Sequence, residues 1–142
     1  MDGDKLIILD DVFDAVTKND MLRFNYKFTD HPEHISKWFK LGENPLHEKI
    51  FNIAAEYFDL SNCNIYELWA NKKTLDWHKD ADEVEREKTG KIKYTICTAI
   101  YYPKVRMEGG ALLTPTVSIL PIENRLILFS SEIPHKVNPY SG

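Results

Sequence analysis

The run Thr74-Leu75-Asp76-Trp77-His78-Lys79-Asp80 decides how the rest of the chain is interpreted. Its first four residues are typical of a β-strand, in which successive side chains point to opposite faces. His78 and Asp80 are therefore predicted to project together, with Lys79 turned away. An imidazole beside a carboxylate supplies two ligands of a facial metal site, and the third must come from elsewhere in the chain.

A second apolar run, Arg125-Leu126-Ile127-Leu128-Phe129, is followed by Ile133-Pro134-His135-Lys136-Val137. If this strand lies beside the first, His135 completes a set of two histidines and one carboxylate, the ligand set of non-haem Fe(II) oxygenases. A lone histidine or aspartate in a strand is usually a surface residue or a satisfied polar group. The prediction rests on the whole arrangement. The two histidines are 57 positions apart (135 minus 78), with a β-rich segment and the pair Gly109-Gly110 between them.

Composition excludes several other classes of protein. A length of 142 residues fits one domain, and 43% hydrophobic with 28% charged residues argues against disorder. A net charge of −4 gives no reason to expect nucleic acid as a partner, and no apolar run is long enough to span a membrane. The acidic start Met1-Asp2-Gly3-Asp4 is unlike a signal peptide, which favours a cytoplasmic protein. Cys63 and Cys97 are too few for a disulfide framework or zinc cluster, and we interpret them as buried thiols in β-strands.

The order of secondary structure predicts an α+β, mainly β, fold. Strand patterns cover residues 5–9 and most of the chain after Asn62, the longest being Lys91 to Tyr102. Three helices are expected near the N-terminus. The first is capped by Asp10 or Asp11 and reaches about Lys18, with Val12, Phe13 and Val16 on its apolar face. The second covers 33–39, and the third runs from Pro45 to about Asp59 with Asn44 as N-cap. Short strands after helices favour a β-sandwich or jelly roll flanked by N-terminal helices.

These features together resemble the 2-oxoglutarate- and Fe(II)-dependent dioxygenases, in their prolyl-4-hydroxylase-like branch. The resembling segments, in the family's order over residues 60–140, are Tyr66, Trp77-His78-Lys79-Asp80, Thr98-Ala99-Ile100-Tyr101-Tyr102, Gly109-Gly110, Asn124-Arg125-Leu126-Ile127-Leu128-Phe129 and Pro134-His135-Lys136-Val137. The resemblance implies a single domain over 1–142. Within it, 61–142 would form a double-stranded β-helix (jelly roll) that lacks its last strand, and 1–60 its helical support.

The resemblance implies that His78, Asp80 and His135 hold Fe(II), with 2-oxoglutarate and O2 as cosubstrates. Oxidative decarboxylation would release succinate and CO2 and hydroxylate a C–H bond of the substrate. We therefore expect a dioxygenase that hydroxylates a protein or peptide side chain, with proline as the candidate. The sequence does not indicate an oligomeric state.

The resemblance also implies a cosubstrate pocket. Tyr102 matches a tyrosine that reaches the distal carboxylate of 2-oxoglutarate, and Tyr66 matches one that lines that pocket. The alternative for both is aromatic core packing. Thr98 and Ile100 share the strand face of Tyr102 and are expected on the pocket floor.

One departure from the family concerns the cation that pairs with the distal carboxylate. In the family a basic residue, usually arginine, follows the second histidine at a position beyond Gly142, where this sequence ends. Because a buried carboxylate without a cation is costly, either the natural protein continues or another cation serves. Arg125 and Lys93 are the candidates in this sequence.

Two other functions remain open at this stage. Two histidines and a carboxylate also suit catalytic zinc in a hydrolase, for which Glu67 or Glu108 would be the general base. The same domain would otherwise be a catalytically inactive jelly-roll binding domain. Metal analysis with a test of oxygen dependence separates these possibilities.

Overall fold

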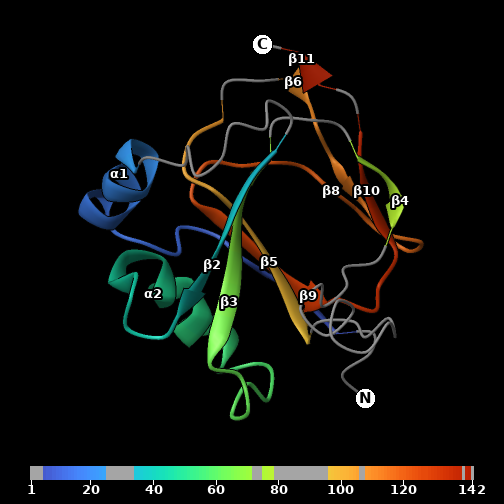
Figure 1. Cartoon of the computed structure of the whole chain (residues 1–142). Helices are drawn as coiled ribbons and strands as arrows, with labels where there is room; N and C mark the ends of the chain where they lie inside the picture. The colour runs from blue at the N-terminus through green and yellow to red at the C-terminus, as the bar shows by residue number, and fades with distance from the viewer. Residues whose placement is uncertain are drawn as a thin grey trace. The chain divides into compact units, whose positions relative to one another are not determined.

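The structure is a computed structural model that describes residues 5–24, 34–71, 75–78, 96–105, 108–138 and 140–141 (Figure 1). Contacts divide the chain into two compact units, one formed by Met1–Val12 with Thr74–Gly142 and the other by Phe13–Lys73. The described residues form mostly β-strands with two helices, which confirms the predicted mainly β class. The single domain over 1–142 stays a prediction.

The first unit contains a three-stranded antiparallel sheet with β9 at its centre. The strands, in spatial order, are β1 (Leu6–Leu9), β9 (Arg125–Ser130) and β5 (Cys97–Tyr102). Leu6 of β1 and Thr98 of β5 both pair with Phe129 of β9. The apolar run of β9 fits its central place, because Leu126 through Phe129 are all 0% exposed.

A second antiparallel sheet of the same unit carries both predicted metal-binding histidines. Its strands, in spatial order, are β4 (Leu75–His78), β10 (His135–Val137), β7 (Leu112–Leu113) and β8 (Ser118–Ile119), and a separate pair joins β11 (Tyr140–Ser141) to β6 (Glu108–Gly109). Gly109 and Gly110 have φ values of +82° and +75°. This left-handed backbone explains the glycine pair, since residues with a Cβ rarely adopt it.

One hydrophobic core draws side chains from both sheets. Leu112, Ile119, Ile127 and Phe129 form its buried centre. Partly buried side chains from β1, β5, β10 and the 130–133 turn pack against it: Leu6, Ile100, Tyr102, Ile133 and Val137. The strands of each sheet thus turn one face toward the other sheet, as in a sandwich.

The described residues of the second unit form two helices and one antiparallel pair of strands. They are α1 (Ala15–Arg23), β2 (His34–Lys40), α2 (Pro45–Ala54) and β3 (Ile65–Asn71), with β2 and β3 antiparallel. The start of α2 confirms the predicted N-cap, because the Asn44 side chain accepts a hydrogen bond from the His47 N–H at 3.1 Å. No helix in the described ranges is both long and apolar enough to cross a membrane.

The predicted first helix was misplaced. It begins at Ala15 with Asp14 as N-cap, and its buried residues are Thr17 and Met21, while Val16 is 70% exposed. Asp10 and Asp11 lie before this helix: the Asp14 carboxylate accepts from the Thr17 N–H at 2.8 Å, whereas the Asp10 carboxylate binds Arg125.

The helix expected over 33–39 is instead strand β2, paired with β3 from His34↔Asn71 to Lys40↔Ile65. The third predicted helix has the expected start but ends at Ala54, not at Asp59. Cys97 lies in β5 as predicted, whereas Cys63 lies just before β3, and both cysteines are half-buried.

Candidate active site

The sheet pairing brings the two predicted histidine ligands next to each other in the backbone. Strands β4 and β10 are antiparallel neighbours, and His78 is the Cα partner of His135. Directly opposite residues of antiparallel strands have Cα atoms about 4.5–5.5 Å apart. Positions far apart in sequence are therefore adjacent across one strand pair.

The environment of His135 suits a metal ligand. The residue is 3% exposed, and its Nδ1 lies 2.9 Å from the carbonyl oxygen of Ile133. Because a carbonyl only accepts hydrogen bonds, Nδ1 carries the proton, and in the neutral ring Nε2 then carries the lone pair. Histidines that bind metals generally donate their other ring N–H to such an acceptor. The Phe129 ring contacts the imidazole edge-on, with centroids 4.8 Å apart.

Asp80 and the side chain of His78 lie outside what the structure describes. No cluster of three potential metal-binding side chains occurs among the described residues, which do not include Asp80. The complete triad of His78, Asp80 and His135 therefore stays a prediction.

The three predicted pocket residues of β5 lie in two environments. Tyr102 and Ile100 pack against the core between the sheets. Burial raises the pKa of Tyr102 to about 12, although the nearby Arg125 acts in the opposite direction. With this pKa, Tyr102 is protonated at neutral pH and able to donate a hydrogen bond. Thr98 has a different environment, because its hydroxyl lies 2.7 Å from that of Ser131.

Tyr66 lies in the second unit within an aromatic cluster. Its ring stacks on Phe39 with centroids 5.8 Å apart and lies 6.0 Å from that of Phe51. Its hydroxyl donates to the carbonyl of Asn44 at 3.1 Å. Burial and then the negative charges of Glu48 and Glu43 raise its pKa to about 12. These contacts explain Tyr66 as a packing residue, and its role in a cosubstrate pocket stays a prediction.

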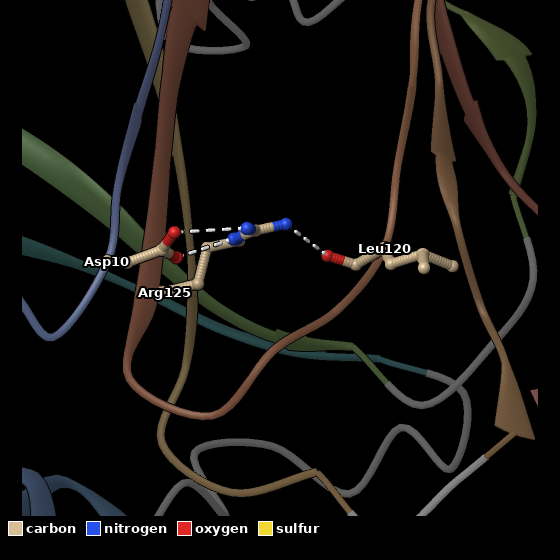
Figure 2. Close-up of polar contacts among 3 residues, drawn as sticks. All are labelled: Asp10, Leu120 and Arg125. Atoms are coloured by element: carbon tan, nitrogen blue, oxygen red, sulfur yellow. Dashed lines mark hydrogen bonds and ion pairs between the residues drawn. The ribbon is translucent and has the colours of Figure 1, made fainter.

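Arg125, a candidate cation for the cosubstrate, already has a carboxylate partner (Figure 2). Its Nε donates to Asp10 Oδ1 at 2.7 Å and its Nη2 to Asp10 Oδ2 at 3.1 Å. Its Nη1 donates to the carbonyl of Leu120 at 3.0 Å. A guanidinium engaged in this bidentate way has fewer N–H donors available for a second carboxylate. The other candidate, Lys93, lies outside the described residues.

Sequence reasoning missed the groups that hold His135 in place. Among them are the carbonyl of Ile133 and the ring of Phe129. A backbone carbonyl leaves no signal in a sequence, and Phe129 was interpreted only as part of an apolar strand.

Comparison with known proteins identifies the family. The family model described as the 2OG-Fe(II) oxygenase superfamily matches residues 61–142, more than half of the chain. No curated protein matches the sequence. The chain is similar to the viral collagen prolyl hydroxylase from Paramecium Bursaria Chlorella virus-1, solved as a 2OG complex. The TM-score is 0.67 at 17% identity, over 99% of this chain and 90% of that chain. At this identity the likeness concerns the fold.

An antiparallel β scaffold with two histidines paired across adjacent strands is the kind of structure that can hold a metal ion. With the family match, the chain belongs to the 2OG-Fe(II) oxygenase superfamily. It is a 2-oxoglutarate-dependent dioxygenase whose cofactor is Fe(II) and whose cosubstrates are 2-oxoglutarate and O2. The enzyme class and cofactors predicted from the sequence are confirmed.

Proposed function

We propose that His78, Asp80 and His135 form the Fe(II) site of this oxygenase, in a jelly-roll core built from the two sheets of the first unit. The observation that carries the proposal is the pairing of His78 with His135 across β4 and β10. The protonated Nδ1 of His135 supports it, because Nε2 is then the atom suited to the metal. All three proposed ligands belong to one compact unit, so the site does not depend on how the two units are arranged.

The substrate we propose is a protein or peptide side chain, with proline as the candidate. Fold similarity to a collagen prolyl hydroxylase supports this choice. Bound Fe(II) with 2-oxoglutarate and O2 would supply the oxidising chemistry, in which the cosubstrate is converted to succinate and CO2 as one C–H bond becomes C–OH.

The residues of this chain would bind, orient and exclude water. His78, Asp80 and His135 would leave the remaining metal positions open for cosubstrate and O2. We assign to the Tyr102 hydroxyl a hydrogen bond to the distal carboxylate of 2-oxoglutarate. Its pKa of about 12 keeps this donor protonated at neutral pH. Apolar side chains around it, including Ile100, would exclude water from that end of the cosubstrate.

The test measures succinate and peptide mass together. The iron-loaded protein is incubated with 2-oxoglutarate, O2 and a library of proline-containing peptides, beside His78→Ala as the matched variant. We expect succinate formation and a mass gain of one oxygen on a peptide, both lost in His78→Ala. Hydroxylation at residues other than proline would correct the substrate. Turnover that persists in His78→Ala would overturn the ligand assignment.

Metal content distinguishes the remaining alternatives. A protein that purifies with zinc and hydrolyses a substrate without O2 would be a hydrolase built on the same residues. A protein whose partner binding is unchanged in His78→Ala, with no succinate from the wild type, would be an inactive binding domain.

A further inference from the structure

A tight turn connects β9 to the histidine-bearing strand β10. The N–H of Ile133 donates to the carbonyl of Ser130 at 3.0 Å, which closes a four-residue turn. Inside it, the N–H of Glu132 lies 3.3 Å from the Ser130 hydroxyl. The turn is thus held both by its backbone and by one of its own side chains.

This turn delivers the acceptor that orients His135. The carbonyl of Ile133, the last residue of the turn, accepts a hydrogen bond from His135 Nδ1, with 2.9 Å between the nitrogen and the oxygen. Pro134 joins the two residues, and its ring restricts φ to about −65°. The Ile133 side chain also packs against the core. A displacement of the turn would therefore move the Ile133 carbonyl and rotate the His135 ring.

The turn is anchored to β5 at its buried corner. Ser131, which is 0% exposed, shares a hydrogen bond of 2.7 Å with Thr98, and its N–H lies 3.4 Å from the carbonyl of Ile96. Ser131 is buried and Thr98 is half-buried, so loss of the Thr98 hydroxyl would take a hydrogen-bond partner from a buried hydroxyl, which is costly. β5 belongs to the sheet opposite the one that contains β10, so the anchor joins the two sheets beside the histidine.

We propose that the Thr98–Ser131 hydrogen bond is a positioning device for His135. It holds the 130–133 turn so that the Ile133 carbonyl keeps the imidazole in the Nδ1–H tautomer, with Nε2 directed to the metal. The inference rests on the proposed metal site and deepens it, since neither residue needs to touch the metal or 2-oxoglutarate. It gives Thr98 a role different from the pocket-floor role expected from sequence.

The same strand offers a matched control. The Tyr101 hydroxyl donates to Asn124 Oδ1, also at 2.7 Å, and Asn124 lies just before β9. Both hydrogen bonds join β5 to an end of β9, but only that of Thr98 lies on the His135 side. Thr98→Val and Ser131→Ala remove the first hydrogen bond, Thr98→Ser retains it, and Tyr101→Phe removes the second.

The first readout needs no metal. In the metal-free protein, ¹⁵N NMR of the histidine side chains should show His135 as a single Nδ1–H tautomer in the wild type, Thr98→Ser and Tyr101→Phe. Thr98→Val and Ser131→Ala should show a mixture of tautomers. A single unchanged tautomer in both folded variants would overturn the proposal. Circular dichroism confirms folding, and should one of the two fail to fold, the other carries the test.

The second readout is Mn(II) affinity, with Mn(II) as a redox-stable probe of the site. Loss of an outer-shell partner of a metal-binding histidine typically weakens metal affinity 10–100-fold. Because Thr98 acts through Ser131 and Ile133, we expect about tenfold weaker binding for Thr98→Val and for Ser131→Ala. Their double variant should be no weaker than either single variant. A rise only in the KM for 2-oxoglutarate, seen in Thr98→Val alone, would assign Thr98 to the pocket floor and overturn the positioning role.

The two readouts separate failure of this inference from failure of the proposed function. Wild-type protein that binds no Mn(II) would contradict the metal site, while the tautomer of His135 would still test the positioning role. Wild-type affinity retained in Thr98→Val and Ser131→Ala would contradict the positioning role and leave the metal site standing.

Discussion

His47 links the stability of the second unit to pH. It is 4% exposed, and its ring meets Phe24 edge-on with centroids 4.7 Å apart. Burial lowers its pKa from 6.5 to about 4. The folded state therefore holds a neutral ring over a range in which the unfolded chain binds a proton. Stability is then fully present above pH 6.5, falls as the pH drops toward 4, and stays reduced below that.

We expect acidification from pH 7 to pH 4 to lower the free energy of unfolding by up to about 3 kcal/mol through this residue, at 1.36 kcal/mol for each pKa unit. Urea titrations across this range measure the loss. His47→Phe keeps an aromatic ring against Phe24 but cannot take up a proton, so it should lose less stability than the wild type. Equal losses in the two proteins would show that His47 does not carry the effect.

The positions and partners of some side chains could be predicted from the sequence, and those of others could not. The position of His135 after a buried apolar strand could be predicted, and its role as a metal ligand stays a prediction. The pairing of Arg125 with Asp10 could not be predicted, because the two residues lie 115 positions apart. The sequence around Asp10 instead suggested that this residue caps a helix. The hydrogen bond of Tyr66 could not be predicted either. Its hydroxyl donates to the backbone carbonyl of Asn44, and every residue has such a carbonyl whatever its side chain.

The N-terminus of α2 gives a prediction about capping. Asn44 is 5% exposed, and its Oδ1 accepts from the His47 N–H, whereas its Nδ2 is buried without a hydrogen-bond partner. Asn44→Ala should lower the free energy of unfolding by about 1 kcal/mol, the usual value of a lost N-cap. Asn44→Ser keeps a capping oxygen and removes the unsatisfied amide, so its stability should be close to that of the wild type. Chemical denaturation measures both, and equal destabilisation by the two would contradict this account.

Strand β9 gives a prediction about the core. Ile127 is 0% exposed between the two sheets, whereas Val16 on α1 is 70% exposed. Ile127→Ala should cost about 2–5 kcal/mol, because it removes buried methyl groups and leaves a cavity. Val16→Ala should change stability by less than about 0.5 kcal/mol. Thermal or urea unfolding compares them, and a small effect of Ile127→Ala would mean that β9 is not central to the core.

Helices and strands were predicted correctly where the local sequence pattern was distinctive. The apolar run Arg125–Phe129 lies within β9, as predicted, and Asn44-Pro45 marked the start of α2 correctly. The segment 34–40 has adjacent Trp38 and Phe39, which fit neither period well, and its strand depends on pairing with β3. Such non-local pairing is not visible in a short window of sequence.

At the scale of the whole chain, the arrangement of the two histidines is a long-range property that sequence nevertheless indicated. The complete ligand set was conditional on the strand before His135 lying beside that of His78, and β10 and β4 are indeed neighbours. The division into two compact units was not foreseen, because Val12 and Phe13 lie in one continuous stretch without a linker composition. Only contacts such as that of Val12 with Asn124 mark the boundary.

The placement of the proposed ligands in one unit leads to a prediction about metal binding. A metal ion that binds only the folded state stabilises it, by about 2.7 kcal/mol at a concentration 100 times the Kd. We expect Mn(II) with 2-oxoglutarate to raise the Tm of the wild type, and EDTA to reverse the increase. Hydrogen exchange should slow most in β4, β10 and β7, because these neighbouring strands carry or flank both histidines. α1 and α2 belong to the other unit and should respond least.

His78→Ala is the control for this experiment, since it removes one proposed ligand from the sheet. It should show neither the increase in Tm nor the slower exchange in β10. An equal response of the variant would mean that the metal binds elsewhere in the chain. A wild-type response centred on α2 would likewise contradict a site at the β4–β10 pair, whereas a response confined to the first unit is what this pairing of histidines requires.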